Sequence, residues 1–147
     1  RTRNAKLAMT LIRGNHDTIL GPIAQWEKMV VRKEFFLPTS QIIVVHGDEI
    51  PLSSNYQQAK IVIMGHEHPA IGLREGPKIE RFKCFLKGKF EDKIVVVLPA
   101  FNSYSEGSDL LQSNPLSPFL EEHLQEFESW LIADKPYYYG KIKKLLK

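Results

Sequence analysis

The sequence has very little cysteine and no long apolar run. Cys84 is the single cysteine among 147 residues, so no disulfide can form within the chain, and this usage is typical of a reducing compartment. No apolar run approaches the roughly 18 residues needed to cross a bilayer. No charged and then apolar leader precedes a small-residue cleavage site. We therefore expect a cytoplasmic protein without a membrane partner.

The composition is that of an ordinary globular domain. Hydrophobic residues make up 43% of the chain and charged residues 25%, which argues against a disordered or fibrous protein. The length suits one domain with a core of its own. The net charge of +3 is compatible with anionic ligands such as phosphate esters or nucleic acid. We expect a single domain over residues 1–147.

Short apolar runs separated by turn residues predict an α/β fold that is rich in strands. A helix is expected within residues 22–32, with Ile23, Trp26, Met29 and Val30 as its apolar stripe. Turns are expected at Gly76-Pro77 and Lys87-Gly88. The remaining expected elements are strands at 6–12, 41–45, 60–64 and 94–98, one or two helical turns at 53–59, a long loop at 101–119, strands at 126–133 and 137–139, and a basic amphipathic tail at 141–147.

Four of the five histidines directly follow the first three of these strands. His16 comes after the strand at 6–12, His46 after 41–45, and His66 and His68 after 60–64. In α/β sheets the carboxyl ends of the strands border the crevice where such folds place their chemistry. Imidazole is a common ligand of divalent metals. The pattern therefore predicts a metal site built from three strand ends.

The turn Gly65-His66-Glu67-His68 contributes most to this prediction. Two histidines separated by one residue in extended backbone project to the same side, while Glu67 projects to the other. Both imidazoles could then reach one metal or two adjacent metals, and Gly65 leaves room for a close approach. A polar turn with incidental histidines explains these residues equally well when they are taken alone. The presence of His46 after a neighbouring strand favours the metal interpretation.

The segment Gly14-Asn15-His16-Asp17 forms the third part of the predicted site. Gly14 can adopt the positive φ that a sharp turn demands. The amide oxygen of Asn15 suits a hard divalent cation that imidazoles also bind, although Asn15 or Asp17 could instead cap the helix that follows. His16 is free to bond or protonate a phosphate oxygen. Asp17 and Asp48 are candidates for orienting the ligands, and a solvent-exposed loop aspartate is the alternative for Asp48.

These three motifs, in this order, resemble the last three motifs of the calcineurin-like metallophosphoesterase family. The resemblance covers the chain from its start to about Pro69. A less specific likeness to the archaeal and DNA-ligase-associated branch of that family lies in Leu98-Pro99-Ala100-Phe101 and in residues 137–145. The family fold that this implies is a four-layer α/β-β/α sandwich, of which the chain would form mostly the second sheet.

The resemblance also implies ligands, cofactors and a reaction. Asn15, His46 and His66 would bind one divalent metal, His68 would bind a second, and His16 would be the catalytic histidine. Mn²⁺ is the metal we expect, with Zn²⁺, Fe²⁺, Ni²⁺ and Mg²⁺ as alternatives. The implied reaction is hydrolysis of a phosphomonoester or phosphodiester, including nucleotides and nucleic acid. A hydroxide activated by two metals roughly 3.5–4 Å apart would attack the phosphorus.

The chain departs from the family pattern at its start. The first two motifs, Asp-x-His and Gly-Asp-x-x-Asp, have no counterpart in residues 1–13. We therefore expect the C-terminal part of a metallophosphoesterase domain, with weak or no metal binding and no useful turnover by these 147 residues alone. An apolar sheet face should be left exposed, so that the chain pairs with the N-terminal segment or with itself.

The sequence also predicts substrate contacts by two arginines and leaves two alternative functions open. Arg13 and Arg74 are the residues that we expect to contact a substrate phosphate. The alternative function is a non-catalytic scaffold on the same fold that binds a protein partner, which the absent aspartates would fit. A metal-storage or sensor module would use the same ligands but leaves His16 without a role.

Overall fold

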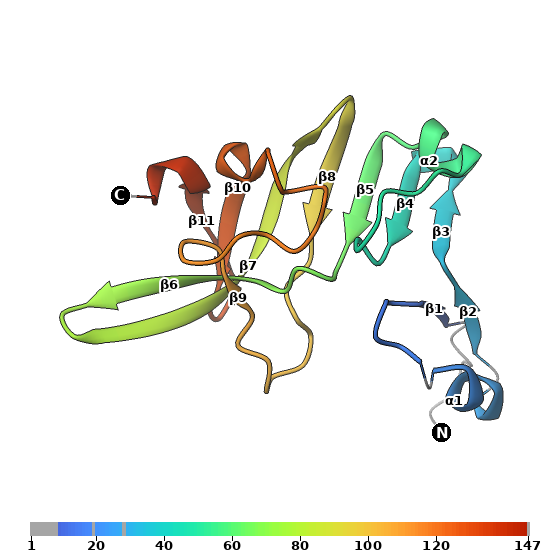
Figure 1. Ribbon diagram of the computed structural model, residues 1–147, viewed down its shortest axis with the longest axis horizontal. Helices are drawn as coiled ribbons and strands as arrows, with labels where there is room; N and C mark the ends of the chain where they lie inside the picture. The colour runs from blue at the N-terminus through green and yellow to red at the C-terminus, as the bar shows by residue number, and fades with distance from the viewer. Residues whose placement is uncertain (1–8, 19, 28, 147) are drawn as a thin grey trace, which may run out of the picture.

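The computed structural model describes residues 9–18, 20–27 and 29–146, apart from the side chain of Ile23. The chain is a mixed α/β structure made mostly of strands (Figure 1). None of the described helices is long and apolar enough to cross a membrane. The elements, in chain order, are β1 (Thr10–Ile12), α1 (Leu20–Trp26), β2 (Val30–Arg32), β3 (Glu34–Leu37), η1 (Pro38–Ser40), β4 (Ile42–Val45), α2 (Ser54–Gln58), β5 (Ile61–Met64), β6 (Pro69–Glu75), β7 (Lys78–Phe90), β8 (Lys93–Val97), β9 (Ser108–Asp109), η2 (Leu124–Glu126), β10 (Glu128–Ile132), β11 (Pro136–Lys141) and η3 (Ile142–Lys144).

One large sheet runs through most of the molecule. Its strand order is β11-β10-β7-β8-β5-β4-β3, and β6 joins it by pairing with β7. The strands β4, β5 and β8 are parallel neighbours, and they consist largely of Ile and Val, the β-branched residues that favour strands. Parallel strands point their carboxyl ends to the same edge of a sheet. The ends of β4, β5 and β8 therefore lie together.

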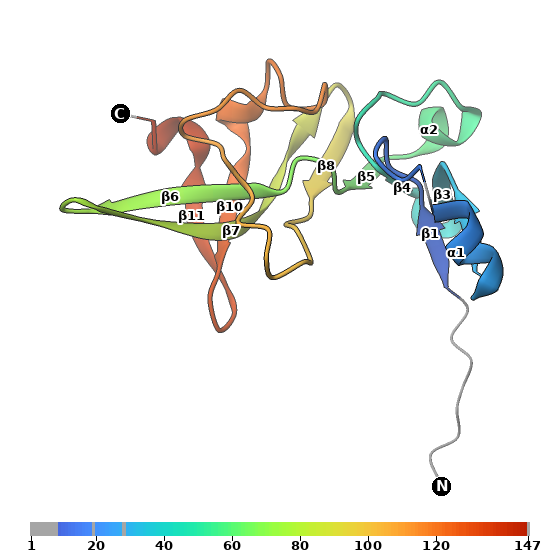
Figure 2. The same ribbon diagram turned by 60° about the horizontal axis from the view of Figure 1, so that its bottom comes forward.

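The long strand β7 pairs with three other strands. Its first half pairs with β6 as a hairpin, and its second half pairs with β10 and β8. Figure 1 shows the hairpin of β6 and β7 reaching well away from the rest of the sheet. At the other end of the molecule, β1 and β2 form a separate parallel pair beside α1 (Figure 2).

The hydrophobic core covers one face of the large sheet. Alternate residues of the central strands, such as Ile43, Val62 and Val95, are fully buried on this face. The segment that leads from β9 to β10 lies across them and contributes Phe119 and Phe127 to the same core. The long loop expected at 101–119 thus includes residues that cover this face of the sheet.

The opposite face of the central strands is only half-buried. The side chains that alternate with the core residues are apolar, all of them aliphatic except Phe35, and the ladder places them in rows across four strands. Leu37 is exposed and Ile63 is partly exposed. We call this surface the aliphatic face; it comprises Phe35, Leu37, Ile42, Val44, Ile61, Ile63, Ile94 and Val96.

Two local expectations are wrong. The helix expected within 22–32 ends at Trp26, because Val30–Arg32 instead pairs in parallel with Thr10–Ile12; Trp26 is 85% exposed and lines no core. The turn expected at Lys87-Gly88 lies inside β7, where the ring of Phe127 packs on Gly88. The chain turns instead after Phe90, at Glu91, whose φ is 54°.

Most of the other expected strands and the short helix are present within a few residues of their expected bounds. Residues 6–8 of the first expected strand, the side chain of Ile23 in the expected helical stripe, and Lys147 of the tail lie outside the described residues.

Candidate metal centre

Three segments bring one amide oxygen and two imidazoles together. His46 and His66 follow the parallel neighbours β4 and β5, and the amide of Gly65 donates to the carbonyl of His46 at 3.1 Å. His66 Nδ1 lies 3.1 Å from His46 Nε2. The same Nε2 lies 3.1 Å from Asn15 Oδ1, on the turn after β1. We call Asn15, His46 and His66 the donor triad.

Gly14 allows the Asn15 turn to approach the ring of His46. A Cβ atom at residue 14 would lie 2.7 Å from His46 Cε1 and 2.9 Å from its Nε2. Gly14 is not among the glycines with positive φ, so the expected reason for a glycine here is wrong. The position needs a glycine because a methyl group would displace the imidazole. Asp17 fixes the same turn by accepting from the Gly14 amide at 2.7 Å.

The His66–His68 turn is left-handed at both histidines. Each has a φ of 48°, a conformation that side chains with a Cβ adopt at some expense. The expectation of extended backbone with alternating side chains is therefore wrong. The expected need for Gly65 is also not met, because a Cβ atom there would have no heavy atom within 4 Å. Strained backbone persists where surrounding contacts over-determine it.

Glu67 supplies those contacts. Its side chain is fully buried, and its Oε2 accepts from the amides of Leu116 and Ser117 at 2.8 and 3.0 Å. The hydroxyl of Ser117 in turn donates to the carbonyl of Gly47 at 2.6 Å. Glu67 thus ties the histidine turn to the residue after His46, through a segment fifty positions away. We call Glu67, Leu116, Ser117 and Gly47 the Glu67 clasp.

Burial shifts the pKa values of two residues in this turn. It lowers the pKa of His66, and the neighbouring His46 lowers it further, while the charge of Asp48 acts in the opposite direction. A neutral His66 ring keeps its lone pair available at neutral pH. Burial also raises the pKa of Glu67, against the two amide donors that favour its charged form.

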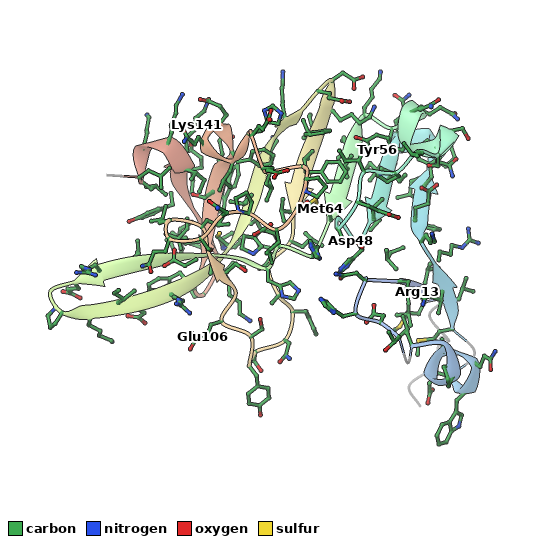
Figure 3. All side chains as sticks on the ribbon, viewed as in Figure 1. Arg13, Asp48, Tyr56, Met64, Glu106 and Lys141 are labelled. Atoms are coloured by element: carbon green, nitrogen blue, oxygen red, sulfur yellow. The ribbon has the colours of Figure 1, made fainter. Side chains whose placement is uncertain are left out.

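The other predicted site residues lie at different distances from the donor triad. His16 follows Asn15 in the sequence and His68 lies two residues after His66, and both side chains are exposed. Among the described residues, neither groups with His46 and His66 closely enough for three such side chains to hold a metal. Arg13 and Asp48 line a cleft of about 630 Å³ beside Asn15 and His46 (Figure 3). Lys33 lines the same cleft and was not predicted. A basic residue without a motif around it gives no signal in the sequence.

Arg74 does not join this group. It lies near the tip of the β6–β7 hairpin, where it pairs with Ile79. There it lines a groove of about 850 Å³ with Leu145 and Leu146, the apolar residues of the C-terminal tail. Its position gives no support to the expected contact with a phosphate held at the donor triad.

The donor triad could hold one divalent ion. Among the described residues, no three His, Cys, Asp or Glu side chains are grouped closely enough to hold a metal, so the third donor beside His46 and His66 would be the Asn15 amide oxygen, 3.1 Å from His46 Nε2. Imidazole nitrogen and amide oxygen are both ligands of first-row divalent metals. The 3.1 Å between the two ring nitrogens is a hydrogen-bond distance, so one nitrogen carries the proton. An ion binding there would replace that proton.

Of the ligands that the sequence predicts, His68 is the one assigned to a second ion, and the described residues contain no group of three His, Cys, Asp or Glu side chains around it. Comparison of the chain with protein-family models, with curated proteins and with solved structures finds no match.

Proposed function

We propose that the chain carries the histidine-rich part of a metal-dependent phosphoesterase site. The observation that supports this most is the convergence of Asn15, His46 and His66 from three separate segments, with His16 directly after Asn15 in the chain. The cleft at the same place is lined by Arg13 and Lys33, which could contact a phosphate, and also by the acidic Glu34, Asp48 and Glu49. The resemblance of the motifs to calcineurin-like metallophosphoesterases leads to the same reaction.

Each residue has a distinct role in this proposal. Asn15, His46 and His66 would hold one divalent cation, preferably Mn²⁺, and His68 would contribute to a second. The cations, when bound, would neutralise charge on the phosphoryl group and make water a better nucleophile. His16 would donate a hydrogen bond or a proton to the leaving oxygen. Arg13 would orient the phosphate, Asp17 would support the turn through the Gly14 amide, and Asp48 would help to orient the ligands.

The same proposal covers the fold and the partners. We propose that the large sheet is the second sheet of a four-layer α/β-β/α sandwich, and that the aliphatic face is the surface on which the first sheet packs. The 147 residues alone would then hold an ion weakly and turn over no substrate, because their ligands suffice for one ion. They would self-associate through the aliphatic face where no other segment covers it.

A protein-binding scaffold is the second candidate. The aliphatic face favours it, since large exposed apolar surfaces mark sites of protein association. It gives no reason, however, for two imidazoles and an amide oxygen to converge on one point.

Hydrolysis of bis-p-nitrophenyl phosphate by the full-length protein with Mn²⁺ tests the proposal. We expect His16→Ala to reduce turnover by roughly 10²–10⁴-fold, the range for loss of a general acid, while bound metal, measured by plasma emission, stays the same. His46→Ala should lose both metal and turnover. His123→Ala is the matched control, since His123 is an exposed histidine that contacts the ring of Phe90, and it should change neither.

Three outcomes would contradict the proposal. Wild-type protein without Mn²⁺-dependent turnover would favour the scaffold, as would metal content unaffected by His46→Ala. Full turnover by His16→Ala would remove the catalytic role assigned to that residue.

A further inference from the structure

Both ends of the loop after β8 are tied to the histidine turn. The amide of Leu98 donates to the carbonyl of Met64 at 2.8 Å, just before that turn. The amide of Ser108 donates to the carbonyl of His68 at 2.8 Å, at its end. Gly107, with a φ of 84°, packs so closely that a Cβ atom would meet the His68 carbonyl at 2.4 Å. The two ends of the loop of residues 98–107 therefore lie beside the histidine turn.

Two aromatic rings on this loop are not used by the fold. Phe101 is fully exposed and Tyr104 is 94% exposed. Figure 1 shows the loop between β8 and β9 projecting away from the sheet, and Figure 3 labels Glu106 on it. A phenyl ring left in water forgoes about 1.5–3 kcal/mol of burial energy. A ligand that covers such a ring would recover this burial energy.

The backbone that carries the rings is held in place. Lys83 Nζ donates to the carbonyls of Ala100 and Asn102, on either side of Phe101, at 3.1 and 2.5 Å. The amide of Tyr104 donates to Asn102 Oδ1 at 2.9 Å. Arg81 pairs with Glu106 at 3.0 Å further along the loop. These contacts fix the base of the loop, so that the two rings stay exposed to solvent and do not pack onto the protein.

The surroundings of the rings favour a flat ligand over a protein surface. The loop residues between and beside them are polar: Asn102, Ser103, Ser105 and Glu106. Protein contact sites usually surround their aromatic anchors with further packed residues that exclude water. Isolated rings on a polar loop can instead stack nucleobases, because every base offers a π face.

We propose that Phe101 and Tyr104 stack the base of a nucleotide whose phosphoester lies at the donor triad. This rests on the proposed function and narrows its substrate class to esters that carry a nucleobase, either as a mononucleotide or as single-stranded nucleic acid. The rings determine specificity and touch the base, while the histidines act on the phosphate.

Fluorescence anisotropy of labelled ligands, with the full-length protein in EDTA so that nothing is hydrolysed, tests this inference. The ligands are a short oligo(dT), an oligonucleotide of equal length with abasic sites, and AMP as an unlabelled competitor. We expect the base-containing oligonucleotide to bind roughly ten-fold more tightly than the abasic one, and this difference to vanish in Phe101→Ala/Tyr104→Ala. Tyr104→Phe, which keeps the ring, should retain it.

Trp26→Ala is the matched control, since Trp26 is an exposed aromatic outside the loop; it should leave the base preference unchanged.

Competition by AMP alone would identify the ligand as a mononucleotide, and competition by oligo(dT) alone would identify it as a single strand. The stacking role would be overturned if base-containing and abasic oligonucleotides bind equally, or if neither binds. It would also be overturned if Phe101→Ala/Tyr104→Ala binds nucleotides as wild type does. If the self-association of that variant in sedimentation also changes, the rings form a protein contact. Failure of the phosphoesterase proposal would appear separately, as absent hydrolysis of bis-p-nitrophenyl phosphate.

Discussion

Replacing Glu67 with alanine should destabilise the fold more than its place in a short turn suggests. The change removes the acceptor of the Leu116 and Ser117 amides. A buried donor left without a partner costs roughly 1–3 kcal/mol, and the Leu116 amide is only partly buried. We therefore expect a loss of about 2–4 kcal/mol in the free energy of unfolding, measured by urea denaturation at pH 7.

Glutamine at the same position separates the hydrogen bonds from the charge. The side chain of Glu67→Gln keeps one oxygen that can accept from both amides, so the loss in free energy of unfolding should be clearly smaller than that of Glu67→Ala.

The raised pKa of Glu67 determines how the stability of wild type depends on pH. The fold favours the protonated form of Glu67, so this contribution is complete below the unfolded pKa of 4.5 and is lost as pH rises through the raised folded pKa. Glutamine does not titrate, so wild type should lose stability relative to Glu67→Gln as the pH rises from 4.5.

The matched control for the clasp is Glu106→Ala, which removes an exposed carboxylate that pairs with Arg81 on the surface. Such a pair contributes little, and the free energy of unfolding should stay within about 0.5 kcal/mol of wild type. Wild-type stability in Glu67→Ala would refute the reasoning, as would equal losses in the alanine and glutamine variants at every pH.

Three further changes test other parts of the structure. Gly88→Ala would place a Cβ atom 2.5 Å from the ring of Phe127 and should cost about 1–3 kcal/mol in urea unfolding, whereas Gly21→Ala, with no heavy atom within 4 Å, should cost nothing. Because burial lowers the pKa of His66, stability should fall as pH drops from about 6.5 through that lowered value, and His66→Gln should flatten this profile; an unchanged profile would contradict it. Sedimentation velocity should find the 147-residue chain self-associated and Ile63→Lys, on the aliphatic face, monomeric; a wild-type monomer would contradict this.

The parts of the site that the sequence predicts are those governed by strand ends. Ile42–Val45 and Ile61–Met64 are continuous aliphatic runs that end at His46 and at Gly65-His66, and parallel pairing places their ends together. The approach of Asn15 does not follow from this rule, because its turn ends β1, which belongs to a separate two-stranded sheet. Local pattern and sheet geometry agree at His46 and His66, which makes their prediction possible.

The parts that the sequence does not predict depend on contacts between distant residues. Val30–Arg32 has the spacing of a helical stripe but becomes a strand because Thr10–Ile12 is available to pair with it. The role of Glu67 depends on amides 49 and 50 residues later. The sequence predicts a turn at Gly88, but the glycine lies within a strand because the ring of Phe127 packs on it. In each case the deciding partner is invisible to a local pattern.

The buried thiol of Cys84 makes this chain convenient for chemical labelling. Burial, aided by the charge of Asp109, raises its pKa to about 12, and its side chain is inaccessible. Thiol reagents attack the exposed thiolate, so maleimides should leave the native protein unmodified. A cysteine introduced at Ser103 would then be the one reactive group, and a fluorophore or spin label attached there would report how the tip of its loop moves when a ligand arrives.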